Sequence, residues 1–265
     1  MVASYKPSQG VMFYGSRSQG FKSGTYNVIN IYAPPTFVEP ELVTTYELGM
    51  KADFFDHLLR FNSAVFDNRI KNKQVGFVSL ISGGAVSLGN AEKTDVKGAE
   101  FDLTLVPLAD WDPGLVITAN GAFLNAKYKK YSEGQGYNET TGIYQNNQDF
   151  SGARVERTPR WSGGLGISQT LGAGSNGEVE LAADTYYNSG FYYSAENKPD
   201  YKEDAYQLVN AHVSYRYLPW QLRLTAFGKN IFDETYHISK FQTDFGILST
   251  LAYGVQYGLI ADLSF

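Results

Sequence analysis

The chain has 265 residues, a formal net charge of −5, aromatic residues at 15% of its positions and no cysteine. The lack of cysteine excludes disulfides and thiolate metal sites, and the mild acidity without a basic block argues against nucleic acid as a partner. A run of 18 apolar residues, which a membrane-spanning helix would need, does not occur. Strands of a membrane β-barrel need only about 9–11 alternating residues each, so that class stays open.

Apolar and polar residues alternate along most of the chain, which is typical of strands with one face in an apolar medium. In TYELGMKADF, Tyr46, Leu48 and Met50 share one face, while Glu47 and Lys51 share the other. Helical spacing would instead place the charged residues among the apolar ones. Eleven such segments predict eleven strands, at about 2–6, 11–21, 43–54, 58–78, 92–107, 114–128, 160–171, 177–191, 205–217, 221–230 and 253–265.

The connections between these segments alternate in length. The short ones are PSQG (7–10), FDH (55–57), LADWDP (108–113), GAGSN (172–176) and LPW (218–220), and the long ones cover about 22–42, 79–91, 129–159, 192–204 and 231–252. All nine prolines lie in connections or at segment ends, where they remove no hydrogen bond from a paired strand. Short turns on one edge and long loops on the other are typical of an outer-membrane barrel with periplasmic turns and extracellular loops.

Aromatic residues gather at both ends of the predicted strands, as two girdles bordering an apolar belt would require. Beside the short turns lie Phe54, Phe55, Trp111, Tyr217, Trp220 and Phe265, and at the long-loop ends lie Tyr128, Tyr131, Tyr186, Tyr187, Phe191, Tyr192 and Tyr193.

The final segment, YGVQYGLIADLSF (253–265), alternates up to its last residue, Phe265. With eleven strands and a short turn after the first, the last strand runs toward the short-turn side, which predicts a periplasmic C-terminus. Phe265 is therefore predicted to lie on the outward face at the barrel rim, where its strand could pair with a first strand and close the barrel edge.

Several stretches resemble the barrel motifs of TonB-dependent outer-membrane receptors, in the family's order and over nearly the whole chain. YELGMKADFFDHLLRFNSAVFDNRIKNKQV (46–75) is similar to their Y-E-x-G-x-K-x-x-F-x-D hairpin, and GSRSQGFKSGTYN (15–27) to their S-x-G-F-K-S-G segment. VKGAEFDLTLVP (96–107) resembles G-x-E-x-x-x-x-x-x-P, FGKNIFDETYH (227–237) resembles N-L-F-D-x-x-Y, and LIADLSF (259–265) resembles the aromatic-ended signal strand.

The resemblance implies an all-β, antiparallel transmembrane barrel of about 22 strands, of which residues 1–265 would supply the C-terminal half as an open or partly closed sheet. Such receptors lie in the Gram-negative outer membrane and take up siderophore-iron, cobalamin or oligosaccharides. No signal peptide, plug or coupling box is recognised in these residues. The implied partners are outer-membrane lipid, the other barrel half and plug, TonB through the coupling box, a small-molecule ligand, and the barrel-assembly machinery, which would read Phe265 as its signal.

The sequence indicates the binding residues less specifically than it indicates the fold. In the 129–159 segment, Tyr137 and Tyr144 suit sugars or aromatic chelators, and Arg154 and Arg157 suit carboxylate or catecholate anions. His212 is predicted to lie on the polar strand face, in the lumen. The three histidines show no metal-ligand spacing, so neither a metal site nor a cofactor is expected.

Two other classes of protein fit part of the pattern. An outer-membrane adhesin or enzyme barrel would fit the alternation, but an enzyme needs a Ser/His or acidic active site near the rim, and no such pair stands out. A soluble carbohydrate-binding β-sandwich would need polar residues on the outward faces, whereas the segments at 43–54, 205–217 and 253–265 carry Leu, Val, Met and Tyr there.

Overall fold

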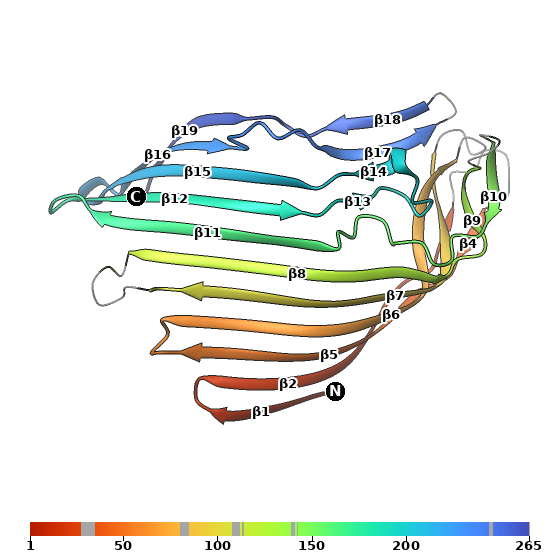
Figure 1. Ribbon diagram of the computed structural model, residues 1–265, viewed down its shortest axis with the longest axis horizontal. Coiled ribbons are helices and arrows are strands. Elements are labelled where there is room, and N and C mark those ends of the chain that lie inside the picture. Colours follow the sequence, from red (N-terminus) through yellow and green to blue (C-terminus); the bar gives the residue numbers. More distant parts are fainter. Residues whose placement is uncertain are drawn as a thin grey trace.

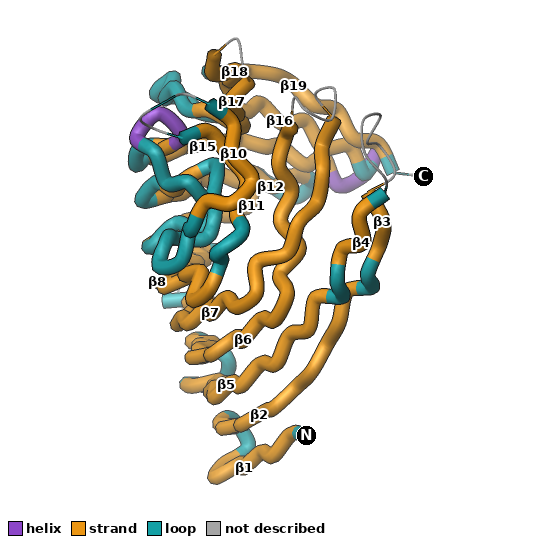
Figure 2. Tube along the Cα trace, turned by 90° about the vertical axis from the view of Figure 1, so that its right-hand side faces the viewer, coloured by secondary structure: helices purple, strands orange, loops and turns teal. Residues whose placement is uncertain are grey.

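Eleven strands form one antiparallel sheet that curves like half a cylinder (Figures 1 and 2). The computed structural model describes residues 1–27, 35–79, 85–107, 112, 114–138, 141, 143–243 and 246–264. Each predicted segment overlaps one sheet strand, so the eleven-strand prediction is confirmed. The strands are β1 (Val2–Ser8), β2 (Val11–Lys22), β5 (Glu41–Phe54), β6 (Leu59–Ser79), β7 (Ala85–Leu105), β8 (Leu115–Lys130), β11 (Trp161–Gly172), β12 (Gly177–Asn188), β15 (Tyr206–Tyr217), β16 (Leu222–Lys229) and β19 (Gln256–Leu263).

The sheet is open. Its strands pair in the order in which they occur along the chain, from β1 at one edge to β19 at the other. No ladder between the described residues joins these two edges, and Figure 1 shows them at opposite ends of the sheet. Among the described residues, no helix is long and apolar enough to cross a membrane.

The pairing register confirms that the two faces differ in polarity. Facing partners across the ladders place Gly15, Leu48, Val65, Ala99, Phe123 and Trp161 in one row of what we call the apolar face. On the opposite, polar face the register aligns Lys51, Asn62, Asp102 and Asn120. Leu48 and Leu259 are 65% and 85% exposed on the apolar face. Exposed apolar surface of this kind marks a contact with another protein or with a membrane.

Short turns follow the predicted positions where the structure describes them. The β5–β6 turn takes three successive non-glycine residues with positive φ, Phe55, Asp56 and His57. The β15–β16 turn is a 3₁₀ turn over Leu218–Trp220, closed by Gln221 with φ of 49°. Most of the turn at 108–113, including Trp111, lies outside the described residues.

Four of the five long connections contain strand pairs of their own, a feature absent from the sequence prediction. These pairs project from the long-loop end of the sheet (Figure 1). They are β3 (Thr25–Asn27) with β4 (Thr36–Val38), β9 (Gly134–Tyr137) with β10 (Tyr144–Gln148), β13 (Phe191–Tyr192) with β14 (Lys202–Glu203), and β17 (His237–Thr243) with β18 (Gly246–Leu251). A 3₁₀ turn at Pro199–Tyr201 precedes β14.

The fifth long connection, expected at 79–91, was predicted wrongly. β7 begins at Ala85 and pairs with β6 as far as Ser79. Contacts with the 22–42 connection hold this extension: the Asn27 side chain bonds the backbone of Leu88, and the side chain of Asn90, on β7 itself, bonds the backbone of Glu39. These partners are distant in sequence, so alternation alone did not reveal the strand.

The girdle prediction was wrong for Tyr128 and Tyr131, which are 0% and 3% exposed. They belong to a buried cluster above the sheet with Val75, Ala91, Ala126, Val155 and Ala195. Tyr128 pairs with Thr94 on the polar face rather than the apolar one, and residues of the 149–160 and 193–201 segments pack against both rings. Tyr187, by contrast, is 44% exposed on the apolar face, as a girdle residue would be.

Candidate functional site

A cavity of about 450 Å³ opens at the long-loop end of the sheet. Its walls come from the upper part of β6 and from the β9–β10, β13–β14 and β17–β18 regions. Aromatic rings form a large part of the lining, which includes Phe77, Tyr131, Tyr137, Tyr144, Tyr193, Tyr201 and Phe241, together with the charged Glu156, Arg157, Glu196 and Lys240. Tyrosine faces with a few charged groups can hold a flat or aromatic molecule that carries charge.

Glu156 anchors one side of the cavity. Its carboxylate lies 2.8 Å from the Lys73 ammonium and also accepts a hydrogen bond from the Tyr128 hydroxyl. Burial alone would raise the pKa of Glu156, but the Lys73 charge and these hydrogen bonds hold it below the ordinary value. Glu156 is therefore a fixed anion at neutral pH, already neutralised by its own lysine.

The β9–β10 hairpin forms a second wall. The rings of Tyr137 and Tyr144 meet edge to face at 5.3 Å, and the Tyr137 amide donates to Glu196 Oε1 at 2.8 Å. The glutamate approaches the backbone so closely that a Cβ on Gly136 would lie 1.8 Å from Oε1. Lys198 lies 3.3 Å from Glu196, which makes the carboxylate part of an ion pair.

Glu203 joins the β13–β14 and β17–β18 pairs. Its carboxylate accepts hydrogen bonds from the Tyr193 hydroxyl at 3.1 Å and the His237 amide at 3.2 Å, and it lies 3.5 Å from Lys240 Nζ. Arg157 reaches the same region, because it donates to the carbonyl of Ile238 at 3.2 Å and covers the Tyr193 ring at 5.2 Å. Loops that are distant in sequence thus form one connected wall.

The buried phenols of the cavity are neutral. Burial, with the negative charge of a neighbouring glutamate, raises the pKa of Tyr131, Tyr193 and Tyr201 above the ordinary value. These side chains therefore offer ring faces and hydroxyl groups rather than phenolate ligands. Among the described residues, no group of three His, Asp or Glu side chains is arranged to hold a metal ion.

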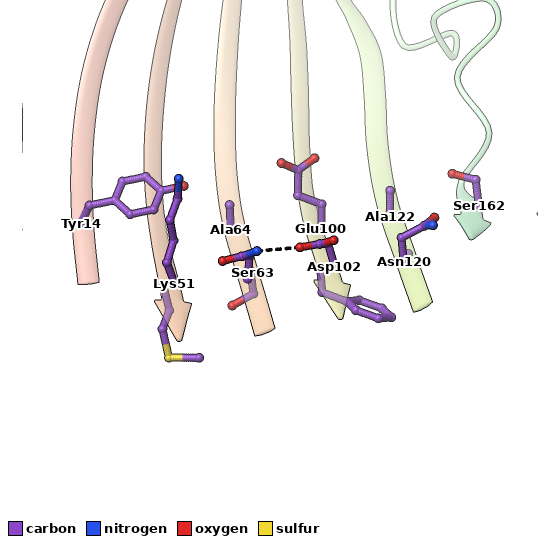
Figure 3. Close-up of a pocket in the computed structure, with 13 residues that line it drawn as sticks. Tyr14, Lys51, Ser63, Ala64, Glu100, Asp102, Asn120, Ala122 and Ser162 are labelled. Atoms are coloured by element: carbon purple, nitrogen blue, oxygen red, sulfur yellow. Dashed lines mark hydrogen bonds between the residues drawn. The ribbon is translucent and has the colours of Figure 1, made fainter. Parts of the chain in front are cut away.

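The polar face of the sheet carries a second hollow, of about 480 Å³, across β2, β5, β6, β7 and β8 (Figure 3). Within it the Asn62 amide donates to Asp102 Oδ1 at 2.6 Å, and Lys51 and Glu100 lie on the same face (Figure 3). The charged side chains and amides of this hollow make it a polar wall, which suits a polar protein surface as well as water.

The structure brings together three of the predicted binding residues, Tyr137, Tyr144 and Arg157, in the loop-end cavity. Arg154 is not part of its lining: the guanidinium donates to the carbonyl of Thr158 at 2.9 Å. His212 lies well away, on the polar face of β15, with Nε2 3.8 Å from Glu180. Phe265 lies outside the described residues, and its role as an assembly signal stays a prediction.

Sequence reasoning missed the contributions of Tyr193, Glu196, Tyr201 and Lys240 to the cavity. Tyr193 belongs to the FYY run at 191–193, which was interpreted as part of a girdle. Glu196, Tyr201 and Lys240 carry no local signal, because folding brings them to the 129–159 segment from 37 or more residues beyond its end.

Comparisons with known proteins agree with this architecture. The ferric yersiniabactin uptake receptor FyuA from Yersinia pestis superimposes with a TM-score of 0.77 at 18% identity, covering 97% of this chain and 35% of that one. The siderophore receptor PiuA from Acinetobacter baumannii gives 0.72 at 19% identity, with 97% and 34% covered. The ferripyoverdine receptor of the outer membrane of Pseudomonas aeruginosa gives 0.67 at 16% identity, with 98% and 32% covered.

The chain thus spans about a third of the length of these solved structures. No curated protein matches its sequence. A family model, described as the TonB-dependent receptor-like β-barrel, matches residues 2–231, which is most of the chain. This protein therefore belongs to the TonB-dependent receptor-like β-barrel family.

Proposed function

We propose that this chain is the C-terminal part of an outer-membrane receptor barrel that takes up a scarce ligand with energy supplied through TonB. A ferric siderophore is the ligand class that fits best. Family membership supports the receptor role, and the structurally similar proteins named above include uptake receptors for ferric yersiniabactin and ferripyoverdine. The protein is accordingly a transport component and not an enzyme.

The loop-end cavity is the observation that carries the ligand proposal. Five tyrosines line it, which suits the aromatic groups of many iron chelators. Arg157 and Lys240 add positive charge at its wall, and such groups stabilise catecholate or carboxylate anions through charge-assisted hydrogen bonds. Tyr137 and Tyr144 would present their rings, whereas Arg154 lies outside the lining and would not contact the ligand. His212 would be met later, in the lumen.

The remaining partners follow from the exposed surfaces. The unpaired edges at β1 and β19 suit further barrel strands, because an exposed strand edge offers a row of free hydrogen-bonding groups. The polar wall of Figure 3 suits a plug domain, through whose coupling box TonB would act. The apolar face would contact outer-membrane lipid, and the barrel-assembly machinery would read the strand that ends in Phe265 at the periplasmic side.

An adhesin or enzyme barrel and a soluble carbohydrate-binding β-sandwich are the competing functions. No specific feature favours either of them. The sandwich is at odds with the single open sheet and with an apolar face on which Leu259 is 85% exposed.

The test measures uptake of radiolabelled iron by cells that produce the receptor, with a panel of ferric siderophores. Arg157→Gln and Lys240→Gln remove the cavity cations. Each should raise the siderophore concentration that gives half-maximal uptake by about tenfold or more, because hydrogen bonds to charged groups contribute about 1.5–3 kcal/mol. Arg154→Gln and Lys229→Gln are matched controls outside the lining and should leave uptake unchanged.

Surface abundance and heat-modifiable migration on gels would be measured for all four variants. Uptake that survives loss of both cavity cations, at normal abundance, would refute the assignment of the cavity. A receptor that transports no ferric siderophore from a broad panel would refute the ligand class.

A further inference from the structure

Charged residues replace apolar ones abruptly on the apolar face, toward the long-loop end. The first row beyond the apolar belt consists of Arg17, Tyr46, Asp67, Lys97 and Asn125, which face one another across β2, β5, β6, β7 and β8. The next row contains Gln19, Thr44, Arg69, Asp95 and Lys127. Together these two rows form what we call the basic rim.

The cations of the rim are prearranged and outermost. The Asp67 carboxylate lies 3.0 Å from the Arg69 guanidinium and 3.5 Å from the Lys97 ammonium. Arg17 and Arg69 both lie over the ring of Tyr46, at 5.9 and 5.2 Å. The side chains of Arg69 and Lys97 are 59% and 57% exposed, whereas that of Asp67 is only 21% exposed. An approaching group therefore meets the cations first.

A third row strengthens the positive charge. Lys71, Lys93 and Lys130 face one another on β6, β7 and β8, directly beyond the rim. Of these, Lys130 lies 3.4 Å from Glu92, which offsets its charge. The three rows hold seven cations and only two carboxylates, in a chain whose formal net charge is −5.

An apolar groove of about 630 Å³ begins immediately below Lys97 and Asn125. Ala99, Gly121 and Gly163 form its floor, and Phe101, Trp161 and Tyr187 are among its walls. The small floor residues lie in adjacent rows of the face, so the groove descends from the rim into the apolar belt. A second groove, of about 600 Å³, runs below Arg17 and Asp67.

We propose that the basic rim and the groove beneath Lys97 form a binding site for an anionic, phosphorylated lipid in the leaflet on the long-loop side. The phosphate would contact Arg69, Lys97 and Lys127, and an acyl chain would lie on the floor of the groove. This inference rests on the proposed membrane location of the barrel.

The combination of features favours a lipid over free phosphate. Basic residues at a membrane surface attract anionic headgroups, with a gain of about 1 kcal/mol per cation. The groove offers apolar surface, which an acyl chain can bury favourably but a free phosphate ion cannot. Membrane depth agrees as well, since the rim borders the belt at the level where headgroups lie.

The experiment uses the protein extracted from membranes in detergent, with lipid retention measured by native mass spectrometry. Phosphatidylglycerol, phosphatidylcholine and inorganic phosphate are added separately. The unmodified protein should retain phosphatidylglycerol in preference to phosphatidylcholine. Lys97→Gln with Lys127→Gln should weaken that retention about 25-fold, which is about fivefold for each cation removed. The matched pair Lys6→Gln with Lys229→Gln removes the same charge from β1 and β16 and should change nothing.

Ala99→Phe, which fills the top of the groove without touching a charge, should also reduce retention. Heat-modifiable migration would show that each variant is folded. Equal retention of the two lipids, equal effects of the two lysine pairs, or complete displacement by inorganic phosphate would each overturn the lipid site. Absence of the protein from the membrane fraction would instead refute the membrane location, and with it the proposed function.

Discussion

Replacing Leu103 by arginine should destabilise the sheet in a membrane far more than the same change at the adjacent Asp102. Leu103 lies on the apolar face between Phe61 and Ala119, its partners on the neighbouring strands. The ten residue steps from Lys97 to Pro107 span about 33 Å of extended chain. At a tilt of about 40° this corresponds to about 25 Å of membrane, the height of an apolar barrel belt. Leu103 therefore lies near the middle of the belt.

The magnitudes differ because the two faces meet different media. An arginine facing lipid near the midplane costs about 2–4 kcal/mol. At Asp102 the change removes the hydrogen bond from Asn62, which is exposed to solvent and therefore contributes only about 0.5–1.5 kcal/mol although one partner is a carboxylate. The free energy of unfolding should therefore fall by about 1–3 kcal/mol more for Leu103→Arg than for Asp102→Arg.

The assay is urea unfolding of the membrane-extracted protein in lipid vesicles, followed by tryptophan fluorescence. Leu103→Ala serves as the control for loss of side-chain volume alone, because it removes the leucine without adding a charge. Equal losses for the two arginine variants, or a larger loss at Asp102, would show that the faces have been assigned to the wrong media.

Three further outcomes are expected at the loop end. Glu203→Gln weakens the charged contacts that hold His237 and its strand, so amide exchange across 237–243 should accelerate while the main sheet is unaffected. Glu156, whose pKa lies below the ordinary value, stabilises the fold above about pH 4.5 and loses this contribution as the pH falls through the lowered pKa. Exchange protection of 149–160 should therefore drop on acidification in the unmodified protein but not in Glu156→Gln. Gly136→Val should displace Glu196 and loosen the β9–β10 hairpin, as seen by proteolysis at 134–148, since even a Cβ would lie 1.8 Å from its carboxylate.

The main sheet could be predicted from the sequence because its determinants are local. Two-residue alternation assigns Leu48 and Glu47 to opposite faces without knowledge of any partner strand, and proline excludes strands from the connections. Strand order also followed, since each strand pairs with the next one along the chain. The extension of β7 back to Ala85 escaped because Asn27 and Asn90 hold it, and their backbone partners are 61 and 51 residues away.

The candidate cavity could be predicted only in part. Tyr137, Tyr144 and Arg157 lie in one segment whose length and whose tyrosine and arginine content indicate a binding loop. Lys240 is held at the same cavity by Glu203, the Lys202 carbonyl and the Tyr193 ring, and no local pattern encodes these contacts. Tyr128 and Tyr131 were misassigned for the same reason: their aromatic character fits a membrane interface equally well, and only the loops that cover them decide between exposure and burial.

Because the 129–159 segment contributes both to the cavity and to the buried cluster, its deletion would test more than ligand binding. Tyr131 and Val155 belong to the buried cluster above the sheet, so deletion removes part of a packed core along with the cavity. Loss of two buried side chains corresponds to about 3–6 kcal/mol, at about 1.5–3 kcal/mol each. The deletion also removes Lys130, which pairs with Lys93, but the parts of the β6, β7 and β8 ladders nearer the short turns lie outside the deleted segment.

The deletion variant should therefore still migrate as a heat-modifiable barrel while Val75 and Ala91 lose their exchange protection. If protection at these residues persisted, the cluster would be held by the sheet alone, and the loop would be a cover that can be removed. Loss of the folded band would mean that the sheet itself requires the loop. Point substitutions such as Arg157→Gln avoid this ambiguity, because they leave the cluster intact and change only the chemistry of the cavity wall.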